Sequence, residues 1–223
     1  MKLFNVKIRL IQESLGTNPG DKEIYESFVA SKAPDAATME EEIANDGADA
    51  VAETGMTVFL KDEAGHPYIY NYMIRGFLKS AAGFCKMATG SKTYKAKLPA
   101  HKKKVDGLIF LPNSQRQLFW ENPDGSLVDL NEIGDCQRPL RADTAQGPRV
   151  SLANSETVPA GSVLQFRMYV LDDALEDLVV EWLHYGCLNG LGQWRNSGKG
   201  SFVVEDLVIE DRAYGDFDEG DYI

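Results

Sequence analysis

The fold-deciding stretch of this chain is LDDALEDLVVEWLHYGCLNGLGQWRNSGKGSF, residues 171–202, in which a helical pattern runs directly into a glycine-rich loop. Apolar residues recur at the spacing of one helical face: Leu175, Leu178, Val179, Trp182 and Leu183. Asp172 is suited to the N-cap, and Gly186 begins the residues that end the helix. The sequence therefore predicts a helix over 172–186 that buries one face.

The loop that follows combines glycines with basic and aromatic residues: Gly190, Gly192, Trp194, Arg195, Gly198, Lys199 and Gly200. Glycine lets a backbone approach a ligand closely, while Arg and Lys donate hydrogen bonds to phosphate. The order helix, loop, strand and the five residues between Gly192 and Gly198 exclude a mononucleotide P-loop. Two interpretations stay open, an anion-binding loop and a long connection that needs glycines for its turns.

Working outward, the remaining apolar patterns predict an alternation of strands and helices. Strands are expected at 4–10, 57–60, 68–70, 107–111, 117–120, 163–171 and 201–209, short helices at 23–31 and 38–45, and a second amphipathic helix at 73–86. Residues 142–159 read as irregular. Without insertions the order is β, α, β, β, α, β, which predicts an α+β, ferredoxin-like antiparallel sheet with two main helices. We expect one domain over 1–223, with 86–140 as a lysine-rich insertion or hairpin arm.

Charge is segregated along the chain. The net charge is −11, which argues against a general nucleic-acid binder. Residues 86–104 nevertheless hold seven lysines and no acid, whereas 35–63 hold nine acids and one lysine, and 205–221 hold eight acids and one arginine. This pattern fits a local nucleic-acid surface, with a solvated lysine-rich loop as the alternative.

Some classes of protein do not fit the sequence. No apolar run approaches the roughly 20 residues that span a bilayer, and the first residues alternate like a strand, so we expect a cytoplasmic protein without a membrane partner. The chain has no CxxC motif and only three histidines, so we expect no metal and no cofactor.

Together with the loop, the segment GHPYIYNYMIRGFLKSAA, residues 65–82, resembles sequences of the repeat-associated mysterious protein (RAMP) superfamily. That superfamily contains RNA-binding backbone subunits and processing nucleases of CRISPR systems. The matching positions in this segment are Gly65, Pro67, Tyr68, Ile69, Ile74, Arg75, Gly76 and Lys79, while residues 70–73 depart from the pattern. The turn at Glu156, Val158, Pro159 and Gly161 is similar too, so three segments resemble the family in the expected order.

The resemblance also bears on catalysis. RNA-cleaving backbone subunits of that superfamily carry an aspartate at a position that corresponds to Met56 here, and neither Glu53 nor Asp62 occupies it. Processing nucleases usually employ an early histidine, and residues 1–65 contain none. We therefore expect no catalytic residues.

The leading hypothesis is a non-catalytic protein that binds RNA or single-stranded DNA and, as the resemblance implies, assembles as a homo-oligomer or hetero-oligomer. The alternative is a structural or interaction protein of viral (phage) origin, such as a nucleic-acid-mimicking decoy, which the acidic composition favours. The expected nucleic-acid-binding residues are Arg75, Lys79, Lys92, Lys95, Lys97, Lys102, Lys103, Lys104, Gly190, Gly192, Trp194, Arg195, Gly198 and Lys199. Five aromatic residues are candidates for stacking on bases, with packing in the core or a hairpin as the alternative: Tyr68, Tyr70, Tyr72, Tyr94 and Trp194.

Overall fold

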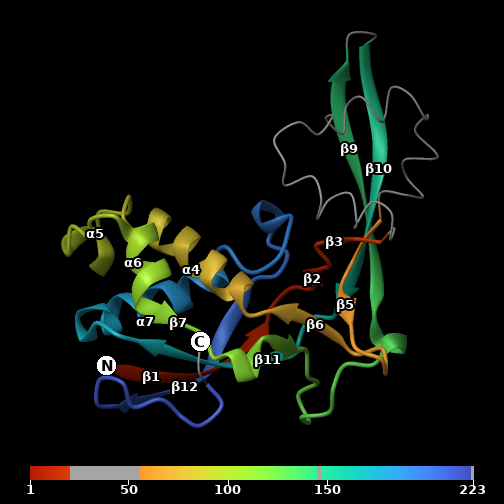
Figure 1. Cartoon of the computed structure of the whole chain (residues 1–223). Coiled ribbons are helices and arrows are strands. Elements are labelled where there is room, and N and C mark those ends of the chain that lie inside the picture. Colours follow the sequence, from red (N-terminus) through yellow and green to blue (C-terminus); the bar gives the residue numbers. More distant parts are fainter. Residues whose placement is uncertain (21–55, 145–146, 222–223) are drawn as a thin grey trace, which may run out of the picture.

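The computed structural model describes residues 1–20, 56–144 and 147–221, and its centre is a four-stranded sheet (Figure 1). The strands follow the order β12-β1-β11-β7, and every neighbouring pair is antiparallel. Their bounds are β1 Lys2–Leu10, β7 Ile109–Phe110, β11 Val163–Val170 and β12 Phe202–Asp211. The expected strands at 4–10, 163–171 and 201–209 are thus confirmed, and the mixture of helices with antiparallel sheets is of the α+β class.

Two helices cover one face of this sheet. Helix α4 spans Tyr72–Cys85 and α7 spans Glu176–His184, with 3₁₀ turns at Asp173–Leu175 and Tyr185–Cys187 on either side of α7. They join one hydrophobic core with alternate residues of β1, and its members include Phe4, Val6, Ile8, Ile74, Phe77, Leu78, Leu175, Leu178 and Trp182. The Asp172 carboxylate accepts a hydrogen bond from the Ala174 amide at 3.0 Å, as its capping role predicts.

The lysine-rich segment is folded onto this helical layer. Helix α5 spans Lys92–Lys95 and α6 spans His101–Leu108, and α6 leads into the edge strand β7. Buried side chains occur between residues 98 and 128, namely Leu98, Val105, Ile109, Leu111, Leu118, Trp120 and Val128. Within the expected insertion or arm, the apolar residues from Leu98 to Val128 therefore pack in the core, whereas residues from Gly134 onward belong to a hairpin.

The element that does extend from the body is a long hairpin (Figure 1). Its strands are β9 Gly134–Thr144 and β10 Gly147–Val158, so the prediction that 142–159 is irregular is wrong. Near its base, β10 pairs with β2 Ser14–Leu15 and β4 Thr57–Val58, and β4 pairs with β3 Asn18–Pro19.

A three-stranded sheet is formed by β5 Leu60–Lys61, β6 Pro67–Tyr70 and β8 Gln117–Phe119. The expected strands at 68–70 and 117–120 are confirmed in this sheet. The expected helices at 23–31 and 38–45 lie outside the described residues. In the part of the chain that is described, no helix has the length and apolar character needed to cross a membrane.

The C-terminal segment covers part of the opposite face of the four-stranded sheet. Here Met1, Leu3 and Tyr169 form a small buried cluster, against which Phe217 packs. The Phe217 ring meets Tyr169 edge-on, with ring centroids 5.0 Å apart. The four-stranded sheet therefore has helices on one face and a partial cover on the other (Figure 1).

Candidate nucleic-acid interface

The glycine-rich loop closes on itself after α7. The Leu191 amide donates to the Gly200 carbonyl at 2.9 Å, and a Cβ on Gly190 would lie 1.7 Å from that same oxygen. A Cβ on Gly200 would lie 1.9 Å from the Leu191 carbonyl oxygen. Gly190 and Gly200 are thus required by close backbone packing, which favours the structural interpretation for these two positions.

The other two loop glycines differ from each other. Gly192 has a φ of +78°, and a Cβ there would lie 3.1 Å from the Leu15 carbonyl oxygen, so this position faces the protein. Gly198 has a φ of +87°, and a Cβ there would meet open space. The space beside Gly198 is therefore open, so the backbone of a ligand can approach the loop at this glycine.

Gln193 docks the loop onto the base of the hairpin. Its amide nitrogen donates to the Gly16 carbonyl and to Thr57 Oγ1, the latter at 2.6 Å. Its amide oxygen accepts from Arg138 Nη2 on β9 at 2.9 Å. One side chain thus ties together the loop, the N-terminal segment, β4 and the hairpin, and fixes the residue that follows it.

That residue, Trp194, pairs with Arg138. The guanidinium carbon of Arg138 lies 5.2 Å from the centroid of the Trp194 ring, a distance typical of a cation–π contact. Trp194 is 37% exposed, and its left-handed φ of 54° turns the chain at this point. Arg138 was not among the expected residues, because no local pattern in the sequence connects a β9 residue with this loop.

The two basic residues of the loop have different surroundings. Lys199 forms an ion pair with Glu13, whose carbonyl also accepts from the Gly200 amide at 2.8 Å. Its charge is therefore largely compensated. Arg195 begins the short 3₁₀ turn Arg195–Ser197, and among the described residues no carboxylate lies within ion-pair distance of it. Arg138 thus contacts the Trp194 ring, and Arg195, the next residue in the chain, adds a second positive charge to this part of the loop.

Glu181 on α7 holds the beginning of the lysine-rich segment. Its carboxylate accepts from the backbone amides of Lys92 at 2.6 Å and Thr93 at 2.9 Å, and from Thr93 Oγ1 at 2.6 Å. Trp182 Nε1 in turn donates to Thr93 Oγ1 at 2.8 Å. Burial acts to raise the pKa of Glu181, but the hydrogen bonds from Thr93 and Lys92 outweigh it, so the pKa lies below its ordinary value.

Several of the expected basic residues are paired with acids. Lys92 Nζ lies 2.6 Å from Asp177, and Lys79 Nζ on α4 lies 2.9 Å from Asp106 on α6. Arg75, also on α4, is half-buried, and the described residues place no acid within 4.0 Å of it. Exposed ion pairs contribute little to stability, but they reduce the charge that Lys79 and Lys92 present to a ligand.

Three other lysines of this segment lie around a hollow in the surface. Lys86, Tyr94, Lys95 and Lys97 line a space of about 330 Å³ with no acid in its lining. Lys97 adopts a left-handed φ of 49°, which bends the chain between α5 and α6. We call this group of four residues the lysine hollow.

Helix α6 adds further positive charge beside the lysine hollow. Lys102 and Lys103 are exposed and Lys104 is half-buried. The neighbouring His101 has a lowered pKa, because burial and then the positive charges of Lys86 and Lys102 disfavour its protonated form. The region is therefore electropositive even though the whole chain is acidic.

The candidate aromatic residues fall into two groups. Tyr68 is buried and packs edge-on against Tyr70, with ring centroids 5.6 Å apart, which favours the packing alternative over base stacking. Tyr70 stacks with Tyr72, which is 58% exposed. Tyr94, 45% exposed at the lysine hollow, and Trp194 retain surface on which a base could stack.

The structure thus creates two separate groups of candidate residues. Trp194, Arg195 and Gly198 meet at the loop, whereas the lysine hollow begins where α4 ends at Cys85. Among the described residues, no group of three His, Cys, Asp or Glu side chains is arranged to hold a metal ion.

No family model matches the chain, and no curated protein matches its sequence. Among solved structures, 163 chains match its fold. One belongs to the cryo-EM structure of the Type III-B Cmr-beta bound to cognate target RNA, with a TM-score of 0.50 and 10% sequence identity.

That match covers 93% of this chain and 60% of the other, so the present chain spans less than two thirds of its neighbour's length. At 10% identity the likeness concerns the fold alone. It supports the resemblance to RAMP proteins as a distant likeness in fold.

Proposed function

We propose that this protein is a non-catalytic RNA-binding protein with a RAMP-like, ferredoxin-like domain that spans the chain. The strand order β12-β1-β11-β7 supports this assignment, with α4 in the connection from β1 to β7 and α7 in the connection from β11 to β12. A β-α-β-β-α-β chain that forms one antiparallel sheet with both helices on one face is the ferredoxin-like arrangement. On this proposal β7 is the short second strand of the domain.

The observation that carries the function is the arrangement of Arg138, Trp194 and Arg195. An exposed indole that contacts the Arg138 guanidinium and is followed in the chain by Arg195 offers a face for a base and planar donors for the adjoining phosphates. Gln193 holds the indole in place through the hairpin base, so little side-chain freedom is lost when a strand binds. Base stacking tolerates any sequence, which fits a protein that follows a single strand.

The lysine hollow and Lys102–Lys104 form the second contact of the proposed interface. Arg75 and Lys86 lie near opposite ends of α4, and eleven residues of helix separate them by roughly 16 Å. A strand that contacts both Arg75 and the lysine hollow would therefore extend along this helix. Lysines suit this role because their mobile ammonium groups neutralise phosphates without a fixed geometry.

The similar solved structure is an assembly bound to target RNA, which favours RNA over single-stranded DNA as the ligand. By the same reasoning we propose that the protein works in the cytoplasm and assembles with copies of itself or with other subunits. Met56 at the position of the catalytic aspartate supports binding without cleavage.

The alternative function is a phage-encoded interaction protein that imitates nucleic acid. The net charge of −11 favours it, because an acidic surface can dock onto a basic nucleic-acid-binding protein. The two functions differ in whether the purified protein itself binds RNA.

Fluorescence anisotropy with labelled single-stranded RNA at low salt tests the proposal. Arg195→Ala is expected to weaken binding about tenfold, as the loss of one charge-assisted phosphate contact would. Arg116→Ala is the matched control, because it removes the same charge from an exposed arginine that packs on Tyr70. Equal effects of the two substitutions would refute the assigned site, and no binding by the wild-type protein would favour the acidic interaction protein.

A further inference from the structure

An anion site lies on the outer face of the four-stranded sheet, and the protein's own C-terminal segment occupies it. Asp221 is 1% exposed, and three side chains donate to its carboxylate. Arg167 Nη2 lies 3.0 Å from Oδ1, Tyr169 Oη lies 2.9 Å from Oδ2, and Ser114 Oγ also donates to Oδ1. Burial raises the pKa of Tyr169, and its hydrogen bond to Asp221 adds to that effect. Its hydroxyl is therefore held in the protonated, donating form.

A second carboxylate shares the same guanidinium group. Asp218 Oδ2 accepts from Arg167 Nη1 at 2.9 Å, and Asp218 Oδ1 accepts from Arg212 Nη1 at 3.1 Å. Asp218 and Asp221 thus each accept a hydrogen bond from one of the two Nη atoms of Arg167. Phosphate oxygens satisfy the same donors, because a guanidinium group pairs with two phosphate oxygens as it does with carboxylates.

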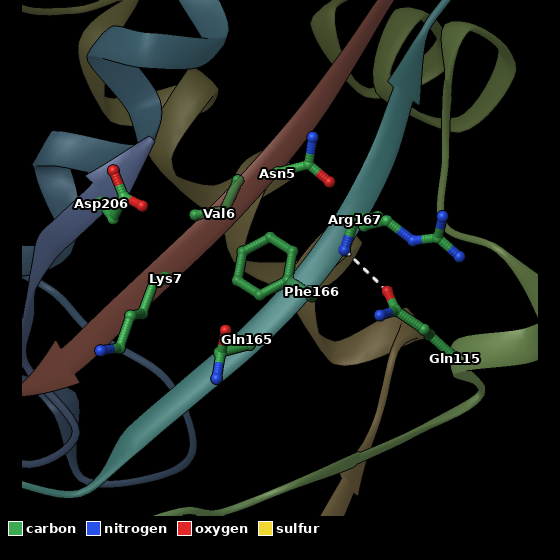
Figure 2. A pocket seen from close by; sticks show the side chains of 8 residues that line it. All are labelled: Asn5, Val6, Lys7, Gln115, Gln165, Phe166, Arg167 and Asp206. Atoms are coloured by element: carbon green, nitrogen blue, oxygen red, sulfur yellow. Dashed lines mark hydrogen bonds between the residues drawn. The ribbon is translucent and has the colours of Figure 1, made fainter. Parts of the chain in front are cut away.

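The surface beside this site is open. A hollow of about 270 Å³ is lined by Asn5, Lys7, Gln115, Gln165, Arg167 and Asp206, together with Val6 and Phe166. Figure 2 shows the side chains of Asn5, Lys7, Gln165 and Arg167 along β1 and β11. The Gln115 amide oxygen accepts from the Arg167 backbone amide at 2.7 Å, which positions Arg167 at the rim of the hollow. Amide side chains suit the polar edges of bases, so the hollow has the character of a nucleotide site.

The segment that covers the anion site is irregular and is held mainly by polar contacts. Between Arg212 and Asp221 its internal backbone hydrogen bonds are turn contacts, such as Asp216 to Ala213 at 3.1 Å and Asp221 to Asp218 at 3.1 Å. Phe217 is its main apolar contact with the sheet. Another anion satisfies the same donors, so a competing phosphate can take the place of the two carboxylates.

We propose that the acidic C-terminal segment, residues 212–221, is an intramolecular competitor for single-stranded RNA. When RNA binds, a phosphate group replaces Asp218 and Asp221 at Arg167, Tyr169 and Ser114, and the adjoining nucleotide enters the hollow. This inference rests on the proposed function, to which it adds a third contact site and a mechanism that restrains affinity. It also explains why an acidic segment lies against an arginine in a protein that binds nucleic acid.

The test compares two double substitutions in the full-length chain. Asp218→Asn with Asp221→Asn removes two negative charges but keeps the shape of both side chains, and Tyr169 can accept a hydrogen bond from the new amide at position 221. Asp216→Asn with Glu219→Gln is the matched control, because it removes the same charge from exposed positions in the same segment. Thermal unfolding establishes that both variants remain folded.

The Asp218/Asp221 variant should bind single-stranded RNA about tenfold more tightly than the wild type, and the slope of log affinity against log salt should steepen by about 0.7. The control variant should change affinity by less than about twofold, since exposed charges are screened. Adding Arg167→Gln to the Asp218/Asp221 variant should abolish the gain. In the wild type, RNA should accelerate hydrogen exchange at the amides of residues 217–221.

Equal gains in the two double variants, or a gain that survives Arg167→Gln, would overturn the inference while the proposed function stands. Absence of RNA binding in every variant would refute both.

Discussion

Thr93→Val is expected to loosen the lysine-rich segment from α7, because Thr93 Oγ1 is shared by two partners. It accepts from the buried Trp182 indole at 2.8 Å and donates to Glu181 at 2.6 Å. Valine has nearly the same shape but can neither donate nor accept a hydrogen bond. An indole N–H left without a partner costs about 1–3 kcal/mol, and a hydrogen bond to a charged group contributes about 1.5–3 kcal/mol.

Because these two effects share one atom, we expect the free energy of unfolding to fall by about 2–5 kcal/mol rather than by their full sum. Urea unfolding followed by circular dichroism and tryptophan fluorescence measures this change. Thr93→Ser is the control, because it keeps the hydroxyl and loses one methyl group, at a cost of about 1 kcal/mol. Equal destabilisation by the two substitutions would refute the role of the hydrogen bonds.

The hydrogen bonds to Glu181 also predict that the free energy of unfolding depends on pH. The pKa of Glu181 is lowered in the folded protein, so its ionised form stabilises the fold. This stabilisation is fully present above the ordinary glutamate pKa of about 4.3 and is lost as the pH falls through the lower folded-state value. Thr93→Val removes one of the hydrogen bonds that lower this pKa. The stability difference between wild type and Thr93→Val should therefore shrink on acidification.

Three further predictions concern the core, the lysines and catalysis. Leu178→Ala should lower the free energy of unfolding by about 2–5 kcal/mol, whereas Leu188→Ala, at a side chain that is 71% exposed, should change it by less than about 0.5 kcal/mol in urea titrations. Changing Lys102, Lys103 and Lys104 together to Ala should flatten the salt dependence of RNA binding by up to about two units, with a smaller change for the ion-paired set Lys79, Lys92 and Lys199. Labelled single-stranded RNA incubated with the protein and magnesium should stay intact on a gel, and cleavage abolished by Asp62→Asn would place the protein among the nucleases.

Local patterns in the sequence were sufficient for the main elements. The alternation of Phe4, Val6, Ile8 and Leu10 predicts β1, and all four side chains are buried. The apolar faces of the helices at 73–86 and 172–186 predict α4 and α7, because a helix in a small domain buries one stripe of side chains. The cap at Asp172 is equally local.

The hairpin and the lysine-rich helices were missed for opposite reasons. The hairpin extends away from the body of the domain (Figure 1). Its strand β10, GPRVSLANSETV, has no sustained alternation of apolar and polar residues, and it forms by backbone pairing with β9. Lysines dominate residues 86–104, so composition favours an insertion or hairpin arm over 86–140. A few apolar residues, such as Leu98 and Val105, are enough to bind it to the core.

The sequence by itself determined the α+β class, the glycine-rich loop and the places where positive charge is dense. Only the tertiary structure decided which of those charges remain available, because Lys199, Lys92 and Lys79 meet acids that lie far away along the chain. It also brought Arg138 to Trp194 and the C-terminal acids to Arg167. Periodicity reports how each element faces the core, whereas a binding site depends on distances between elements, and those distances arise only when the whole chain packs.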